Sequence, residues 1–105
     1  MALTRSFKDL VQRRVAEDPA FGAALLREAI ETMLAGDLDA AKTVLRDYIK
    51  ATGGFEMLAG ETGTPAKSLM RMFGPRGNPA ARNLLRVIAC LQDRAGLRLT
   101  VTAGP

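Results

Sequence analysis

The chain has 105 residues, the size of one domain, and 48% of them are hydrophobic, which is enough to build a core. It contains no His, which excludes Ser-His and Cys-His catalytic pairs and the usual Cys/His zinc sites. No apolar run approaches the roughly 18 residues of a membrane span, and the N-terminal stretch lacks the apolar centre of a signal peptide. We therefore expect a cytoplasmic protein that holds no metal or cofactor and contacts no membrane.

The net charge of +4 is unevenly distributed along the chain. Residues 1–53 carry eight basic and eight acidic side chains, whereas residues 54–105 carry seven basic and three acidic ones. No acidic residue lies between Glu61 and Asp93, and the basic residues in that stretch are Lys67, Arg71, Arg76, Arg82 and Arg86. A stretch of one sign predicts a polyanionic partner such as nucleic acid. Charge alone is equally compatible with a solvated basic face that binds nothing.

Apolar spacing in the first half predicts three helices, over about residues 6–17, 19–35 and 38–51. Asp18-Pro19 and Asp37 are typical of helix starts, because the Asp carboxylate accepts from free amides and Pro needs no amide partner. Gly36 is a typical helix end, because glycine adopts the left-handed conformation at little cost. The residues expected on the buried faces are Phe7, Leu10, Val11, Val15, Phe21, Leu25, Ile30, Met33, Leu34, Leu38, Ala41, Leu45, Tyr48 and Ile49.

The second half is expected to hold two short helices and one long helix. The short ones cover about residues 55–60 and 64–73, and the long one begins at Asn78-Pro79 and ends at Gly96. The residues expected inside the long helix's apolar face are Leu84, Leu85, Val87, Ile88 and Leu91. The tail, residues 97–102, alternates apolar and polar side chains, which predicts a short strand. Its pairing partner would be a cryptic extended segment or a second subunit; the alternative is a frayed end that packs its three apolar residues locally.

The two short helices have the residue types of a helix-turn-helix. Helices that cross closely need a small residue at the crossing, which Ala59 supplies. The sharp turn after the first helix needs a positive φ, which Gly63 supplies. Leu58, Leu69 and Met72 are expected to fill the wedge between the helices. We therefore predict an all-α fold of five to six short helices that contains a lambda-repressor-like helix-turn-helix and ends in a short β-strand.

The second short helix is expected to bury one face and to present cations on the other. At about 100° per residue, Lys67 and Arg71 point away from Leu69. Such a helix can lie in a major groove, where Arg and Lys contact guanine edges or phosphates. Thr64 is expected to be the N-cap, and the amides that follow it would bind phosphate. The expected DNA-binding residues are Thr64, Ala66, Lys67, Ser68, Met70, Arg71, Arg76 and Asn78. The alternative for Met70 is that it is half-buried in the packing and contacts no DNA. The alternative for the two short helices as a whole is an ordinary helix bundle with a solvated basic face.

Residues 53–101 resemble the Xre (lambda-repressor-like) class and, more narrowly, the HigA-like addiction-module antidote proteins. The resemblance is carried by Leu58-Ala59, Glu61-Thr62-Gly63, Ser68-Leu69, Gly77-Asn78-Pro79 and Gly96-Leu97-Arg98-Leu99. It implies that the second short helix reads operator DNA, that the protein is a homodimer repressing its own operon, and that a RelE/ParE-like toxin is a partner. Pro65-Ala66 departs from the polar residues that many relatives have there. We expect one domain, with residues 1–53 as a helical extension and residues 54–105 as the DNA-binding part.

The same sequence features are also compatible with functions other than that of an antitoxin. A stand-alone or prophage-type regulator would share the DNA-binding part, and a protein-interaction module without DNA binding would need only the helices. An enzyme is not expected, because the nearest carboxylate pairs, Asp37 with Asp39 and Glu28 with Glu31, suit helix caps or solvated faces better than acid-base catalysis. Cys90, alone in an apolar run, is expected to be a small buried hydrophobe rather than a reactive thiol.

Overall fold

The structure, a computed structural model, describes residues 2–104 and the side chains of residues 9–104. The helices are α1 (Ala2–Glu17), α2 (Pro19–Leu34), α3 (Leu38–Ala51), α4 (Gly54–Thr62), α5 (Ala66–Met72) and α6 (Ala81–Ala95). Residues 2–104 contain no strand, so this part of the chain is all-α as predicted. None of its helices is long and apolar enough to cross a membrane. The side chain of Phe7, expected on a buried face, lies outside the described residues.

The helix ends in the first half follow the local signals that the sequence carries. The carboxylate of Asp18 accepts from the amides of Ala20 and Phe21, and Pro19 occupies the first helical position of α2. The carboxylate of Asp37 accepts from the amide of Ala40 at the start of α3. These capping predictions are confirmed.

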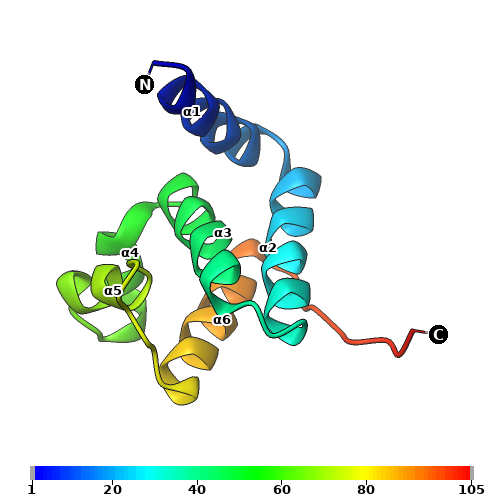
Figure 1. The fold of residues 1–105 in the computed structure, drawn as a ribbon, viewed down its shortest axis with the longest axis vertical. Coiled ribbons are helices and arrows are strands. Elements are labelled where there is room, and N and C mark those ends of the chain that lie inside the picture. Colours follow the sequence, from blue (N-terminus) through cyan, green and yellow to red (C-terminus); the bar gives the residue numbers. More distant parts are fainter. Residues whose placement is uncertain (1, 105) are drawn as a thin grey trace.

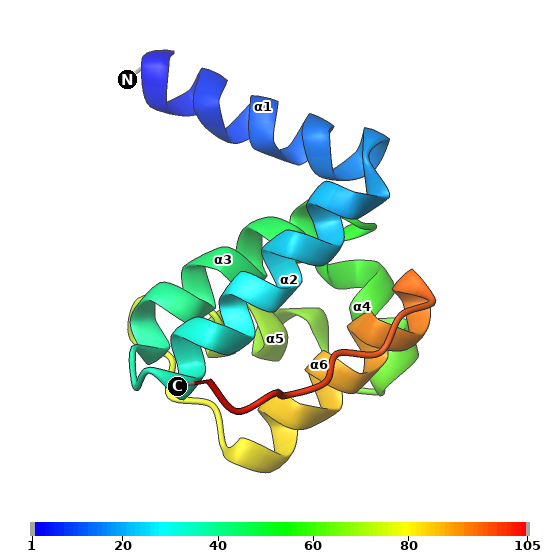
Figure 2. The ribbon, with the colours of Figure 1, turned by 90° about the vertical axis from the view of Figure 1, so that its right-hand side faces the viewer.

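The helices are arranged around α3 (Figure 1). Helix α2 packs along one side of α3, the α4–α5 pair lies on the other side, and α6 closes the space below them. The N-terminal part of α1 projects away from the rest in both ribbon views (Figures 1 and 2). The tail after α6 runs back along α6 and below α2 (Figure 2), so both helices flank residues 99–102.

A single hydrophobic core joins the two halves of the chain. Its buried members come from every helix and are Val15, Leu26, Ala29, Leu45, Tyr48, Ile49, Phe55, Leu58, Leu69, Phe73, Val87 and Leu91. The rings of Phe55 and Phe73 lie with their centroids 6.3 Å apart in a tilted arrangement. Residues 1–53 and 54–104 bury side chains against each other, so the α4–α5 pair is packed against the N-terminal helices.

Three leucines expected on buried faces are exposed instead. Leu10, Leu34 and Leu85 are 59%, 68% and 63% exposed. Leu10 lies on α1, part of which projects from the body. Leu34 is the last residue of α2 and Leu85 lies in the second turn of α6, and both line an open hollow between these helices and the tail. Leu26, which the helical spacing did not single out, is fully buried in the core.

Some element boundaries in the second half also differ from the predictions. Helix α4 continues to Thr62, and α6 begins at Ala81 rather than at Pro79, with no side chain capping it. The strand expected over residues 97–102 is not formed, and residues 97–104 have no regular secondary structure. The tail bonds to α6 instead of to a neighbouring strand, because the amides of Leu97 and Leu99 donate to the backbone and side-chain carbonyls of Gln92.

Candidate nucleic-acid interface

A three-residue turn connects α4 to α5. Gly63 ends α4 with a left-handed φ of 77°, and its amide donates to the carbonyl of Ala59 at 2.9 Å. A side chain at this φ would be strained, which is why the turn needs glycine. The positive φ predicted at Gly63 is confirmed, and the turn lets the chain reverse within residues 63–65.

One face of α5 is fixed against the core. Leu69 and Phe73 are each 1% exposed, and Leu58 of α4 is fully buried opposite them. Ala59 and Met72 are half-buried against the same cluster. The expected wedge between the two helices is therefore present, and it sets which face of α5 is left for solvent.

The opposite face of α5 carries exposed, mostly cationic side chains. Lys67 and Arg71 are exposed, and Met70 between them is 47% exposed, so it does not belong to the core. Ser68 is half-buried beside them. This division into a buried and an exposed face is the one that the sequence predicts.

A surface depression of 480 Å³ brings together five of the eight residues predicted to contact DNA. Those five are Thr64, Ser68, Arg71, Arg76 and Asn78. Lys67 and Met70 lie exposed on α5 outside it, and Ala66 packs against the core. The depression also includes Asn83 in the first turn of α6, which the sequence reasoning missed. Asn83 could have been found from the sequence, because it lies within the stretch that has no acidic residue and soon after Asn78-Pro79.

Thr64 does not cap α5, contrary to the prediction. Pro65 occupies the cap position in an extended conformation, with ψ of 143°, and no side chain caps the helix. The carbonyl of Pro65 accepts from the amide of Leu69 at 3.0 Å, so the helical bonds start one residue later than expected. The seven-residue helix thus begins at Ala66, and Thr64 belongs to the turn.

The loop after α5 is held by two cationic side chains from α3. Lys42 Nζ donates to the carbonyls of Gly74 and Gly77, at 3.0 and 2.6 Å. Arg46 Nη1 donates to the carbonyl of Phe73 at 3.4 Å. The sequence reasoning missed these contacts, although Lys42 lies three residues before Leu45 and so shares the buried face of its helix.

An ion pair ties the end of α4 to α6 and α3. Arg94 Nη2 lies 2.6 Å from Glu61 Oε1, and the same guanidinium donates to the backbone carbonyl of Thr52. The hydrogen bond from Arg94 holds the pKa of Glu61 below its ordinary value. This contact connects the last turns of three helices around the α4–α5 pair.

Cys90 lies beside this ion pair and is half-buried, not fully buried as predicted. Its thiol donates to Glu61 Oε1 at 3.2 Å, so its surroundings are more polar than the sequence indicates. Burial, together with the contact to Glu61, raises the pKa of the thiol. A thiol with a raised pKa stays protonated at neutral pH, which disfavours nucleophilic reactivity.

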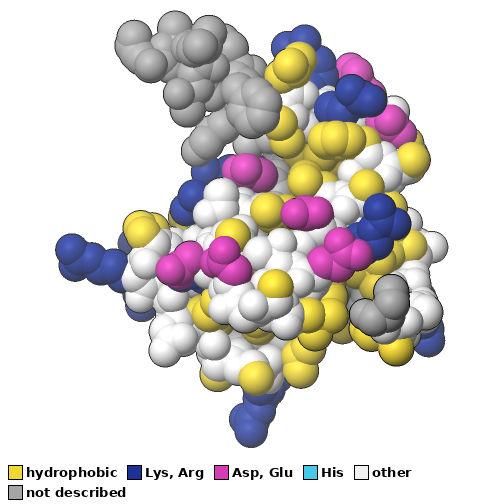
Figure 3. Space-filling model, turned by 45° about the vertical axis from the view of Figure 1, so that its right-hand side comes forward, with side chains coloured by type: hydrophobic (Ala, Val, Ile, Leu, Met, Phe, Trp, Pro, Cys, Tyr) yellow, Lys and Arg dark blue, Asp and Glu magenta, His cyan; other side chains and the backbone are white. Residues whose placement is uncertain are grey.

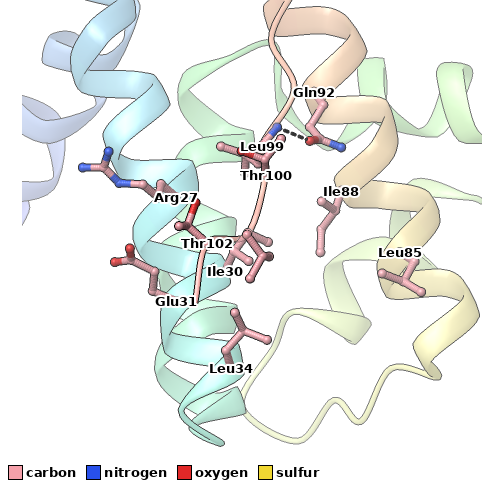
Figure 4. Close-up of a pocket in the computed structure, with 11 residues that line it drawn as sticks. Arg27, Ile30, Glu31, Leu34, Leu85, Ile88, Gln92, Leu99, Thr100 and Thr102 are labelled. Atoms are coloured by element: carbon pink, nitrogen blue, oxygen red, sulfur yellow. Dashed lines mark hydrogen bonds between the residues drawn. The ribbon is translucent and has the colours of Figure 1, made fainter. Parts of the chain in front are cut away.

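A second hollow, of 320 Å³, lies between α2, α6 and the tail (Figure 4). Figure 4 shows Leu34 of α2 and Leu85 of α6 facing this space from opposite sides, with Leu99 of the tail between the two helices. Of the described residues that line it, Arg27 and Glu31 are charged, and both lie on α2. The hollow is thus a largely apolar groove. Among the described residues, no group of three or more Cys, Asp or Glu is placed to hold a metal ion.

Charged side chains are unevenly distributed along the chain and over the face seen in Figure 3. On the face in Figure 3, acidic side chains lie across the middle, among hydrophobic ones. Between Glu61 and Asp93 no acidic residue occurs, and the five basic side chains of that stretch are all exposed. The described residues that line the depression beside α5 are therefore neutral or cationic.

Comparisons with known proteins found no matching protein-family model, no similar curated protein and no similar solved structure.

We predict that Gly77→Ala, in the loop after α5, lowers the free energy of unfolding. A Cβ at Gly77 would overlap the carbonyl oxygens of Arg71 and Met72, so the backbone would have to move. Overpacking of this kind costs about 1–3 kcal/mol of unfolding free energy. Gly60→Ala in α4 is the control, because its Cβ meets nothing within 4 Å. The control should stabilise by about 0.5–1 kcal/mol. Urea denaturation of both variants measures this, and equal tolerance of the two substitutions would contradict the close approach at Gly77.

Proposed function

We propose that this protein is a sequence-specific DNA-binding transcriptional regulator, in which α4 and α5 form a helix-turn-helix and α5 is the recognition helix. The observation that carries the proposal is the two-sided character of α5. Leu69 and Phe73 anchor one face in the core, while Lys67 and Arg71 stand exposed on the other. A rigidly seated helix with an outward cationic face suits the major groove of duplex DNA.

The surroundings of α5 support a duplex rather than a small ligand. The depression beside it is continuous from Arg71 through Arg76 to the start of α6, and its lining includes the side chains of Asn78 and Asn83. Arg side chains bind guanine or phosphate, and Asn side chains bind adenine or phosphate. We assign Arg71, on α5, to contact with a base or a phosphate. We assign Arg76 and Asn78 to contact with the DNA phosphate backbone beside that site.

A protein-interaction module is the second class of function, and the charge pattern argues against it. Protein interfaces are depleted in charge at their centres, whereas the sequence from Thr62 to Gln92 has exposed cations and no acidic residue. One exposed carboxylate, that of Asp39 on α3, lies beside the loop of this stretch. A depression whose described lining has cations and no carboxylate suits a phosphate backbone better than a mixed protein surface.

The resemblance to HigA-like antitoxins extends the proposal to a biological role. Such a protein represses its own operon and neutralises a co-encoded RelE/ParE-like toxin. A small basic open reading frame next to this gene, whose product binds this chain on co-expression, would support the antitoxin role. Without such a neighbour, the stand-alone or prophage-type regulator is the role that remains.

We further propose that the protein acts as a homodimer through its tail. One helix of this size contacts few base pairs, and two copies can read half-sites about one helical turn apart. The tail alternates apolar and polar residues but has no strand partner within residues 2–104, and Val101 is 77% exposed. Leu97 and Leu99 bond to Gln92 and pack on the core, whereas residues 100–102 are exposed beside the groove and can pair with the same segment of a second copy.

We expect Arg71→Ala to weaken duplex binding strongly. Loss of one good base contact costs about 1–3 kcal/mol. Arg13→Ala, which removes an exposed arginine from α1, is the control and should bind as the wild type does. Fluorescence anisotropy with the duplex upstream of the gene, at several salt concentrations, measures the affinities. Thermal melts show that both variants are folded. Equal losses in the two variants, or affinities that do not depend on salt, would contradict the role of α5.

We expect Val101→Asp to be monomeric at a concentration at which the wild type is a dimer. The substitution places a charge at an exposed position, so it should disturb pairing and not the fold. Leu10→Asp adds the same charge at an exposed leucine on α1 and should stay dimeric. Light scattering measures the mass of each. A monomeric wild type at micromolar concentration would rule out the stable dimer, and a monomeric Leu10→Asp beside a dimeric Val101→Asp would move the interface to α1.

A further inference from the structure

Lys42 is a buried cation on α3, at the bottom of a hollow formed with the loop after α5. The residue is 4% exposed, and its Nζ donates to the carbonyls of Gly77 at 2.6 Å and Gly74 at 3.0 Å. The carboxylate of Asp39 lies 3.6 Å from Nζ, but that side chain is 93% exposed. The two loop carbonyls are therefore the main partners of a charge that is otherwise withdrawn from water.

A buried ammonium group is costly unless its protons find acceptors. Here the acceptors lie three residues apart in one turn, where the amide of Gly77 also donates to the carbonyl of Gly74 at 3.0 Å. A single Nζ therefore holds both ends of the turn. An apolar side chain at position 42 would leave these two carbonyls without that donor, and the turn would no longer be connected to α3 there.

The turn that Lys42 holds carries residues of the proposed DNA surface. Arg76 lies between the two bonded carbonyls, and Asn78 follows directly after them; both line the depression beside α5. Gly77 also packs closely on the carbonyls of Arg71 and Met72, so the turn lies against the end of α5. The position of Nζ on α3 thus determines where these side chains stand relative to Arg71.

We propose that Lys42 is a positioning residue for DNA recognition, through which the N-terminal helices hold the turn of residues 74–77 in the orientation that presents Arg76 and Asn78 alongside α5. This rests on the proposed DNA-binding function. It gives residues 1–53 a role in recognition although no residue of that half was expected to contact DNA.

The test compares Lys42→Met with Lys50→Met. Both substitutions remove one lysine from α3 and change the net charge equally, but Lys50 is exposed. Lys42→Met should bind the upstream duplex about tenfold more weakly, with a slope of log affinity against log salt that is smaller by about 0.9 for each phosphate that the variant no longer neutralises. Its amides at residues 74–78 should exchange with deuterium faster, while those of α6 keep wild-type rates. Lys50→Met should leave the exchange unchanged and the affinity within about threefold, since it removes only general charge.

Each outcome decides the proposal. Faster exchange at residues 74–78, weaker binding and a smaller salt slope in Lys42→Met support it. Unchanged exchange there, or unchanged affinity, overturns it while leaving the DNA-binding function intact. Lys42→Gln is the second variant in case Lys42→Met does not fold. If neither folds, Lys42 serves the whole core and the positioning role is overturned. The affinity of the wild type for the upstream duplex at low salt is measured first. A wild type that binds no duplex overturns the proposed function itself.

Discussion

Helix α5 has only seven residues, so it depends on tertiary contacts for its existence. Isolated helices shorter than about 12–15 residues are marginal in water. The burial of Leu69 and Phe73 supplies what the helix lacks by itself, and both side chains pack into a cluster to which α1, α2, α3, α4 and α6 also contribute. The exposed face of α5 follows from this anchoring, because the face of α5 that is buried determines the face that is exposed.

Polar contacts then fix the ends of the α4–α5 pair. Arg94 joins the end of α4 to α3 and α6, and Lys42 joins the loop after α5 to α3. Both cations donate to backbone carbonyls, which are acceptors that any sequence provides. The N-terminal helices are thus physically coupled to the part of the chain that carries the basic surface. The sequence can be divided at residue 53, but the residues on either side of that position share one hydrophobic core.

Much of this arrangement could be predicted from the sequence because it rests on local signals. Asp18 and Asp37 cap helices by accepting from amides two or three residues away, and Gly63 ends α4 through its own positive φ. The two faces of α5 follow from helical spacing. Predictions failed where the outcome depends on distant residues. Leu34 and Leu85 have core-like spacing, yet no further helix covers them, and Pro65 takes the cap position expected for Thr64. The partners of Lys42 lie more than 30 residues away, and no pattern within α3 indicates them.

The most direct test of the DNA-binding account is a map of the surface that a duplex protects. Amide hydrogen exchange of the full chain would be compared with and without the upstream duplex at low salt. The account predicts protection concentrated in residues 64–83, with smaller effects over α1 and α2. Protection confined to α1, α2 or the groove beside the tail, or no protection at saturating duplex, would contradict the assignment of α5 as the recognition helix.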